Sequence, residues 1–130
     1  MHERSLVRLL LHQIIEAALK NSLAQGNCSE IRVRKVVVAC GELSGVEPEL
    51  VSLAFNEMRG STDHSGVTTD QAELEIRRQP ILARCIECGF EFKVEDFEFL
   101  CPTCRSTNNQ VLAGEDFHLQ TIDIELDNRL

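Results

Sequence analysis

The sequence lacks long hydrophobic runs, and no stretch approaches the ~18 consecutive apolar residues that suggest a membrane-spanning helix. Its start also lacks the basic, apolar and small-residue regions of a secretory signal peptide. A hydrophobic fraction of 43% beside 26% charged residues is ordinary for a folded soluble chain of 130 residues. We therefore expect a cytoplasmic protein without a membrane partner, in which thiols stay reduced and clustered cysteines bind metal.

Basic residues are scarce. Thirteen Lys and Arg residues face 21 Asp and Glu residues, which gives a formal net charge of −8. Nucleic-acid affinity depends on cations that neutralise phosphates, so this balance argues against a nucleic-acid partner.

The sequence motifs of the common enzyme classes are missing as well. A G-x-S-x-G elbow, a P-loop and a G-x-G-x-x-G turn do not occur. The carboxylates are spaced as on the solvent-exposed faces of helices and strands. We find no candidate catalytic residue and expect the chain not to be an enzyme. Cys28 and Cys40 are expected to be buried spectators rather than nucleophiles.

The sequence does contain two Cys-x-x-Cys pairs, Cys85/Cys88 and Cys101/Cys104, separated by twelve residues. Two residues between cysteines allow both thiolates of a tight turn to bind one ion, and two such pairs complete a tetrahedral shell with Zn–S distances of about 2.3 Å. Four protein ligands leave no open position for water or substrate. A structural zinc site is therefore favoured over a catalytic one.

Hydrophobic periodicity predicts an α+β fold, in which two helices pack on a small sheet of about three strands. The last strand has no partner nearby in the sequence, so we expect it to return to the sheet formed by the first two. The polar segment 61–70 is expected to be a loop. The expected elements are, in order, a helix over 5–25, a strand over 31–40, a helix over 48–60, a strand over 72–76 and a strand over 117–126.

The cysteine pairs lie between Pro80 and Gly114, so the zinc segment is expected to form an inserted, zinc-ribbon-like lobe. We predict an α/β domain made of residues 1–80 plus 115–130 and a zinc-binding domain made of residues 81–114. Four of the six phenylalanines lie between the pairs and predict a hydrophobic cluster too slight to fold without the ion: Phe90, Phe92, Phe97 and Phe99.

A second metal-binding pattern begins the chain, as Met1-His2-Glu3. A free amine, the amide nitrogen of His2 and its Nδ1 can chelate one metal in adjoining rings, and the Glu3 amide or an outside histidine would complete a square. Ni(II) and Cu(II) prefer planar nitrogen donors strongly enough to displace amide protons. Taken alone, a Met-His start indicates no more than a frayed terminus.

Together these features resemble the HypA/HybF nickel metallochaperones. The resemblance covers nearly the whole chain, with its motifs in order at compatible spacings. Its residues are the Met1-His2-Glu3 start, 41–47 (GELSGVE), 72–76 (AELEI), Pro80, the two cysteine pairs and the closing strand from Gly114 to Glu125. Arg4, Arg105 and a longer 61–70 segment depart from the family pattern, and none of them is an expected metal ligand.

The resemblance implies a cytosolic accessory protein that carries Ni(II) to the large subunit of [NiFe]-hydrogenase. It implies a HypB-type GTPase as a partner and, in some organisms, a role with urease maturation proteins. Nickel would be bound by Met1 and His2 with help from Glu3, so that the α/β domain is the nickel-binding domain, and structural Zn(II) by the four cysteines. The main alternative is a zinc-ribbon protein-interaction module without a nickel role, and a hydrolytic or redox enzyme is the third interpretation.

Overall fold

The computed structural model describes residues 3–25 and 30–127. The chain forms two compact units, each assembled from segments that lie apart in the sequence. Unit 1 contains Met1–Val38, Glu47–Ile76 and Leu119–Leu130, and unit 2 contains Ala39–Val46 and Arg77–His118. Among the residues described, no helix is long and apolar enough to cross a membrane.

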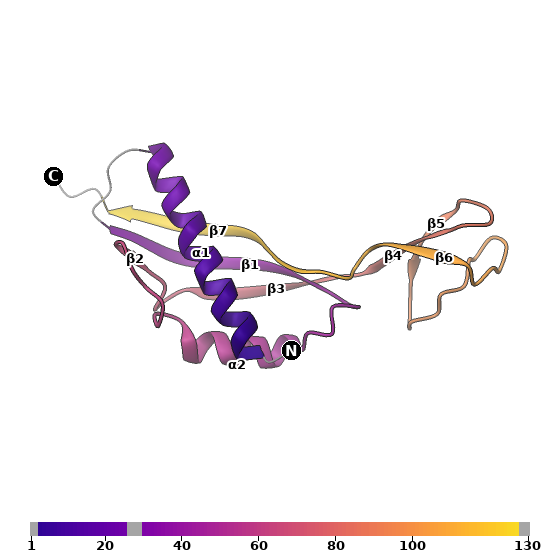
Figure 1. Ribbon diagram of the computed structural model, residues 1–130, viewed down its shortest axis with the longest axis horizontal. Coiled ribbons are helices and arrows are strands. Elements are labelled where there is room, and N and C mark those ends of the chain that lie inside the picture. The colour runs from indigo at the N-terminus through magenta and orange to yellow at the C-terminus, as the bar shows by residue number, and fades with distance from the viewer. Residues whose placement is uncertain (1–2, 26–29, 128–130) are drawn as a thin grey trace. The chain divides into compact units, whose positions relative to one another are not determined.

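The order of helices and strands confirms the predicted α+β class (Figure 1). The described elements are α1 (Glu3–Gln25), β1 (Glu30–Gly41), α2 (Pro48–Met58), β2 (Val67–Thr68), β3 (Glu73–Gln79), β4 (Ile81–Cys85), β5 (Glu91–Val94), β6 (Asn109–Ala113) and β7 (Phe117–Asp127). The prediction that 61–70 is a loop throughout was wrong at β2. Val67 is buried there, and its polar neighbours concealed it in the sequence.

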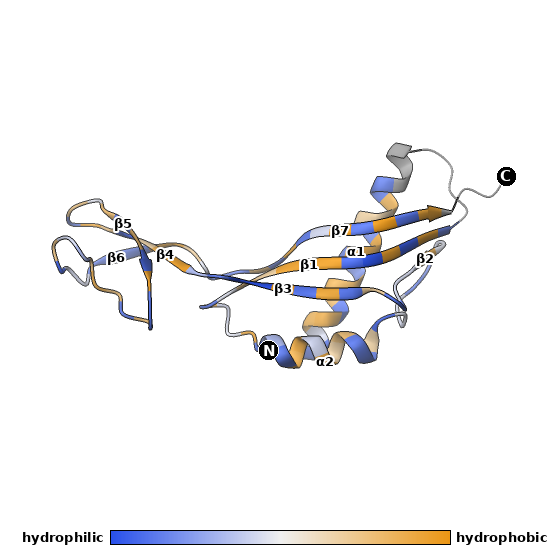
Figure 2. Ribbon diagram, turned by 180° about the vertical axis from the view of Figure 1, so that it is seen from behind, coloured by the Kyte–Doolittle hydropathy of each residue, from blue (hydrophilic) through white to orange (hydrophobic). Residues whose placement is uncertain are grey.

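Unit 1 is organised around β1, which is hydrogen-bonded to β2, β3 and β7. The pairing with β2 is parallel, with Ile31 opposite Val67 and Arg32 opposite Thr68. Because β7 pairs with β1, the expected return of the last strand to the sheet is confirmed. Figure 2, the view from behind, places α1 beyond the sheet, whereas Figure 1 places it in front, so α1 lies across one face of the sheet.

The core of unit 1 forms where the apolar stripes of the two helices meet the inward-facing residues of β1. α1 and α2 contact each other, and α2 begins with Pro48, whose missing N–H is no loss at the first helical position. Each large apolar side chain buried here contributes about 1.5–3 kcal/mol. The fully buried side chains include Val7, Leu11, Ile14, Ile15, Val33, Val36, Val38, Val51 and Phe55.

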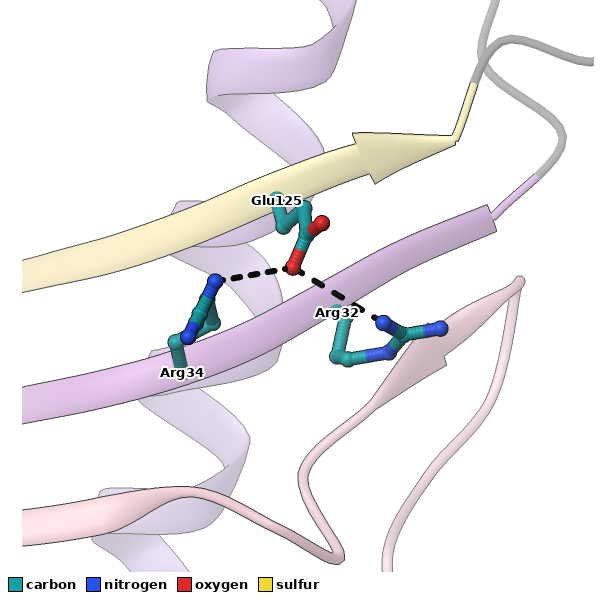
Figure 3. A network of polar contacts seen from close by, with 3 residues as sticks. All are labelled: Arg32, Arg34 and Glu125. Atoms are coloured by element: carbon teal, nitrogen blue, oxygen red, sulfur yellow. Dashed lines mark hydrogen bonds and ion pairs between the residues drawn. The ribbon is translucent and has the colours of Figure 1, made fainter.

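The side chains of β1 that point away from this core carry charge. Ile31 and Val33 are buried while Arg32 and Arg34 between and after them are exposed, as the two-residue period of a strand requires. Glu125 of β7 lies between the two arginines, with its Oε2 3.7 Å from Arg32 Nη1 and 3.2 Å from Arg34 Nη1 (Figure 3). These half-exposed pairs contribute at most about 1 kcal/mol each.

Unit 2 is a three-stranded antiparallel sheet in the order β5-β4-β6. Ala83 of β4 lies opposite Phe92 of β5 and Val111 of β6, with an irregularity in the β6 pairing between Leu82 and Ala83. Its buried core is small, and Leu43, Phe99 and Val111 pack against it. The core consists of Ile81, Ala83, Cys85, Phe92, Val94 and Cys101.

Two of the four phenylalanines expected in this core are not in it. Phe92 and Phe99 contribute as predicted, but Phe90 is 45% exposed and Phe97 is 58% exposed. Both exposed rings lie outside the strands, in connecting segments where the backbone turns. The prediction was wrong for these two residues because amino-acid composition does not show which aromatic rings point into the core of a small zinc-binding lobe.

A close backbone approach within unit 2 depends on two glycines. The N–H of Gly41 donates to the carbonyl of Asp116 (2.8 Å), and the N–H of Leu43 donates to the carbonyl of Gly114 (2.8 Å). A Cβ on Gly41 would clash with the carbonyl group of Gly114. Gly114 itself has φ 102°, and a Cβ there would lie 2.8 Å from the carbonyl oxygen of Pro80.

We expect Gly41→Ala to lower the free energy of unfolding by about 2–3 kcal/mol, because the added methyl group overlaps backbone that cannot move aside cheaply. Gly45→Ala is the matched control. Gly45 has φ 74°, but a Cβ added to it would have no atom within 4 Å, so the variant should lose only about 1 kcal/mol through backbone strain. Chemical denaturation measures both, and equal losses at the two positions would contradict the close approach.

Candidate metal centre

The first cysteine pair forms a tight turn at the end of β4. The N–H of Cys85 donates to the carbonyl of Phe90 (2.9 Å), and the N–H of Gly89 donates back to the carbonyl of Cys85 (2.9 Å). Gly89 has φ 79°, in the left-handed region that glycine adopts without strain. The backbone thus brings Cys85 and Cys88 to one side of the turn by local hydrogen bonds.

The second pair repeats this hydrogen-bond pattern. The N–H of Cys101 donates to the carbonyl of Ser106 (3.0 Å), and the N–H of Arg105 donates to the carbonyl of Cys101 (2.9 Å). Arg105 therefore occupies the position that Gly89 holds in the first turn, and its φ is 63°. A residue with a Cβ in this conformation costs about 1–2 kcal/mol.

Replacing Arg105 with glycine should therefore stabilise the protein. We expect Arg105→Gly to raise the free energy of unfolding by about 1 kcal/mol, since relief of strain exceeds the extra freedom of glycine in the unfolded chain. Arg105→Ala is the matched control, because it removes the same charge but keeps the Cβ. Denaturation of the metal-loaded variants checks this, and equal stability of the glycine and alanine variants would refute it.

The two turns bring four sulfur atoms together. The Sγ atoms of Cys85 and Cys104 are 3.5 Å apart, those of Cys88 and Cys101 are 3.6 Å apart, and all four lie within 4.8 Å of one another. A tetrahedral shell with Zn–S distances of about 2.3 Å has sulfur–sulfur edges of about 3.8 Å. The cluster has the size of a four-cysteine metal-binding site, with one buried and one exposed cysteine from each pair.

Two of the thiols ionise more readily than a free cysteine. The backbone N–H of Cys88 is the main group that lowers the pKa of Cys85. Burial raises the pKa of Cys101, but the N–H groups of Cys104 and Thr103, with the neighbouring thiols, outweigh it and lower that pKa to about 6. Thiolate, the form that binds metal, is therefore available at one buried position of each pair.

The other two thiols resist ionisation. The N–H of Ser106 lowers the pKa of Cys104, but the hydrogen bond with Cys85, burial and the remaining thiols raise it to about 12. The N–H of Phe90 lowers the pKa of Cys88, yet burial and the thiols of Cys101 and Cys85 raise that pKa overall. Four thiolates this close repel one another, so full ionisation requires a cation among them.

The structure places only part of the predicted N-terminal site. Met1 and His2 lie outside the described residues, and Glu3 is the first residue of α1. The neighbouring Arg4 forms an ion pair with Glu57 of α2, with Nη1 2.8 Å from Oε2. The two side chains are about two-thirds exposed, so this ion pair between the start of α1 and α2 contributes little to the stability of the fold.

The two remaining cysteines were expected to be buried spectators. Cys28 lies outside the described residues. Cys40 is a buried free thiol at the end of β1, with its Sγ 3.7 Å from Ser44 Oγ and 3.8 Å from the carbonyl oxygen of Val46. The prediction for Cys40 is confirmed as far as burial is concerned.

One feature of unit 2 was missed from the sequence. After β5, the N–H of Glu98 donates to the carbonyl of Glu95 (3.0 Å) and closes a turn in which Asp96 has φ 53° and Phe97 has φ 58°. Turns of this kind are usually marked by Asn-Gly or Asp-Gly, and neither occurs here. The available signal was a phenylalanine among three acidic residues, which by itself does not indicate a turn.

Comparisons with known proteins agree with this geometry. The sequence matches, over residues 1–124, the HypA family, described as hydrogenase/urease nickel incorporation, metallochaperone. The hydrogenase maturation factor HypA of Aquifex aeolicus is 37% identical and is matched over 98% of this chain and 100% of that one. The corresponding factor of Wolinella succinogenes is 35% identical, with 98% of each chain covered.

Solved structures of the family share the fold. The solution structure of the Ni metallochaperone HypA from Helicobacter pylori superposes with a TM-score of 0.64 at 26% identity, covering 99% of this chain and 100% of that one. A second solution structure of a HypA protein gives 0.65 at 28% identity, with 96% and 97% covered. By sequence, by fold and by its four-cysteine metal site, the chain belongs to the HypA family of nickel-incorporation metallochaperones that act in hydrogenase maturation.

Proposed function

We propose that this protein binds one Ni(II) ion at its N-terminus, through Met1 and His2 with help from Glu3, and delivers it to the large subunit of [NiFe]-hydrogenase. The single observation that carries the proposal is the family match across residues 1–124, which includes both the Met-His start and the cysteine cluster. Residues 1–80 plus 115–130 act as the nickel-binding domain, and residues 81–114 act as the zinc-binding domain.

The donor set supports zinc as the resident metal of the cluster. Four thiolates in tetrahedral arrangement suit Zn(II) or an iron–sulfur centre, and the closed shell leaves no ligand position for chemistry. Zn(II) is redox-inert and would supply folding energy. That energy matters here because Cys85 and Cys101 are themselves part of the small buried core of unit 2.

The start of the chain supports nickel as cargo. An amine, a deprotonated amide and an imidazole form the kind of planar nitrogen set that Ni(II) prefers. A carrier must also release its ion, and protonation of any of these groups weakens the chelate. A terminal chelate can open without unfolding a core, which a buried cage cannot do.

A protein that delivers nickel needs a recipient and accessory proteins rather than a substrate. A HypB-type GTPase and the hydrogenase large subunit are the proposed partners, with urease maturation proteins in organisms that make urease. The chain acts in the cytoplasm as a carrier, not as an enzyme. Nucleic acid is disfavoured, because Arg32 and Arg34 pair with Glu125 and Lys35 Nζ lies 3.1 Å from Glu75 Oε1.

A transfer experiment tests the delivery step. The untagged protein, loaded with one equivalent of radioactive Ni(II), is mixed with a nickel-free large-subunit precursor, with and without the GTPase, in the presence of a chelator that captures free nickel. We expect nickel to appear on the precursor faster than from an equal amount of free Ni(II). If the precursor gains no more nickel from the loaded protein than from free Ni(II) in the presence of the same chelator, the alternative of a zinc-ribbon interaction module is favoured.

A further inference from the structure

The four cysteines of the metal centre differ in their exposure to solvent. Cys88 and Cys104, the second cysteine of each pair, are exposed, whereas Cys85 and Cys101 are buried. In the protein loaded with Zn(II) all four are thiolates, because the metal displaces their protons. Ionisation does not distinguish them in that state. An oxidant or electrophile that arrives from solvent therefore reaches one particular cysteine of each pair first.

Backbone hydrogen bonds divide the cysteines in the same way. Among the described residues, each buried sulfur, that of Cys85 and that of Cys101, accepts from the N–H groups two and three residues further along the chain. Each exposed sulfur, that of Cys88 and that of Cys104, accepts from the N–H group two residues further along. An N–H donor withdraws electron density from a thiolate sulfur and lowers its nucleophilicity. The exposed sulfurs are therefore also the more nucleophilic ones.

Each exposed sulfur lies next to the buried sulfur of the other pair. Cys104 Sγ is 3.5 Å from Cys85 Sγ, and Cys88 Sγ is 3.6 Å from Cys101 Sγ. The sulfur atoms of a disulfide are about 2.05 Å apart, so a bond at either contact requires a movement of about 1.5 Å. When a second thiol lies beside an oxidised cysteine, the oxidation can end in a reversible disulfide rather than in an irreversible sulfinic acid.

We propose that Cys88 and Cys104 are sites of reversible thiol oxidation by hydrogen peroxide. Each forms a disulfide across the cluster, as Cys104–Cys85 and Cys88–Cys101, and Zn(II) is released. This inference rests on the proposed zinc occupancy and goes beyond it, because the structural site then also responds to an oxidant. The closed shell keeps water and substrate from the metal, but it does not shield the two exposed ligands.

Each disulfide consumes one molecule of hydrogen peroxide. The thiolate of Cys104 attacks one peroxide oxygen, the O–O bond breaks and hydroxide leaves, so that the sulfur becomes a sulfenic acid. The thiolate of Cys85 then attacks that sulfur, the S–S bond forms, the S–O bond breaks and a second hydroxide leaves. Two protons from solvent convert the two hydroxides to water. The same steps at Cys88 and Cys101 remove the remaining thiolate ligands.

Zinc release and disulfide mapping test the proposal on the full-length, untagged, zinc-loaded protein. Zinc is counted first, and hydrogen peroxide is then added with a coloured zinc chelator, beside a sample without peroxide. We expect about one Zn(II) released per chain for about two peroxide molecules consumed, and a chain mass lower by about 4 Da. Trypsin cleavage after Arg84, Lys93 and Arg105 leaves each cysteine pair on its own peptide, so cross-cluster disulfides join the two peptides. A thiol reductant with added Zn(II) should restore the loaded protein.

Alkylation identifies the reactive sulfurs. A substoichiometric amount of iodoacetamide should label Cys88 and Cys104 at least about tenfold more than the two buried ligands, as read from fragment ions of the tryptic peptides. The matched variant Cys28→Ser/Cys40→Ser removes the two cysteines outside the cluster. It should release zinc at the rate of the natural sequence, within about twofold, and should show the same loss of mass.

Three results would overturn the proposal. Zinc could stay bound at peroxide concentrations that oxidise the thiols of the metal-free, denatured chain. The disulfides could form within each Cys-x-x-Cys pair and leave the two peptides unjoined, or the buried cysteines could be labelled as fast as the exposed ones. A chain that holds no zinc before peroxide is added would contradict the zinc assignment of the cluster and this inference with it. Nickel binding is not part of any readout.

Discussion

A His2→Ala variant of the untagged protein should lose stoichiometric Ni(II) binding, with affinity at least about 100-fold weaker, while its zinc content and melting transition stay unchanged. In the proposed chelate the imidazole of His2 would close the second ring, and without it the amine alone would not offset the loss of an amide proton. Isothermal titration with Ni(II) measures the loss.

The matched control for this variant is His12→Ala, which removes another histidine, an exposed one on α1. It should bind Ni(II) as the natural sequence does. An equal loss of Ni(II) affinity in both variants would mean that nickel binding does not depend on His2 specifically. Unchanged Ni(II) affinity in His2→Ala would contradict the proposed site. Nickel affinity of the natural sequence should also fall steeply below about pH 6.5, because imidazole and amine then hold protons that the metal must displace.

The second large effect is expected at the cysteine cluster. Cys101→Ser should reduce the zinc content from one ion per chain to nearly none and should unfold unit 2, while the helical signal of α1 and α2 persists. Structural zinc contributes about 10–16 kcal/mol of binding energy in small zinc-binding peptides, more than the few buried side chains of unit 2 can replace. Metal analysis and the dispersion of amide signals from 81–113 give the readout.

Cys40→Ser is the matched control for this experiment. Cys40 is also buried in unit 2, but its Sγ contacts Ser44 and Val46 rather than the cluster. The control should keep its zinc and its fold, with at most a small loss of stability from altered packing. Retention of one zinc ion and a normal unfolding transition in Cys101→Ser would show that the four thiols are not a closed structural site.

The parts of the fold that the sequence predicted are those encoded locally. Apolar spacing located α1 and α2, a valine-rich run located β1, and alternation located β3 and β7, because each pattern extends over several residues. The cysteine cluster was predictable for the same reason, since two-residue spacing determines the shape of each turn. Arg105 occupies the same place in the second turn as Gly89 in the first, and it has a positive φ that its residue type does not favour.

The features that the sequence did not predict depend on contacts between distant segments. β2 has only two residues and is defined by its pairing with Ile31 and Arg32. The assignment of 39–46 to unit 2 follows from the backbone approach of Gly41 to Gly114, which no periodicity signals. Which phenylalanines face the core, and the turn at Phe97, likewise required the three-dimensional arrangement.

The most direct test of the central claim compares Ni(II) titration of the untagged protein with that of the same chain carrying a few residues fused ahead of Met1. The extension removes the free amine from Met1 but changes no side chain. We predict one tightly bound nickel ion for the native start and none for the extended chain, with equal zinc in both. Equal nickel stoichiometry and affinity in the two proteins would contradict an N-terminal nickel site.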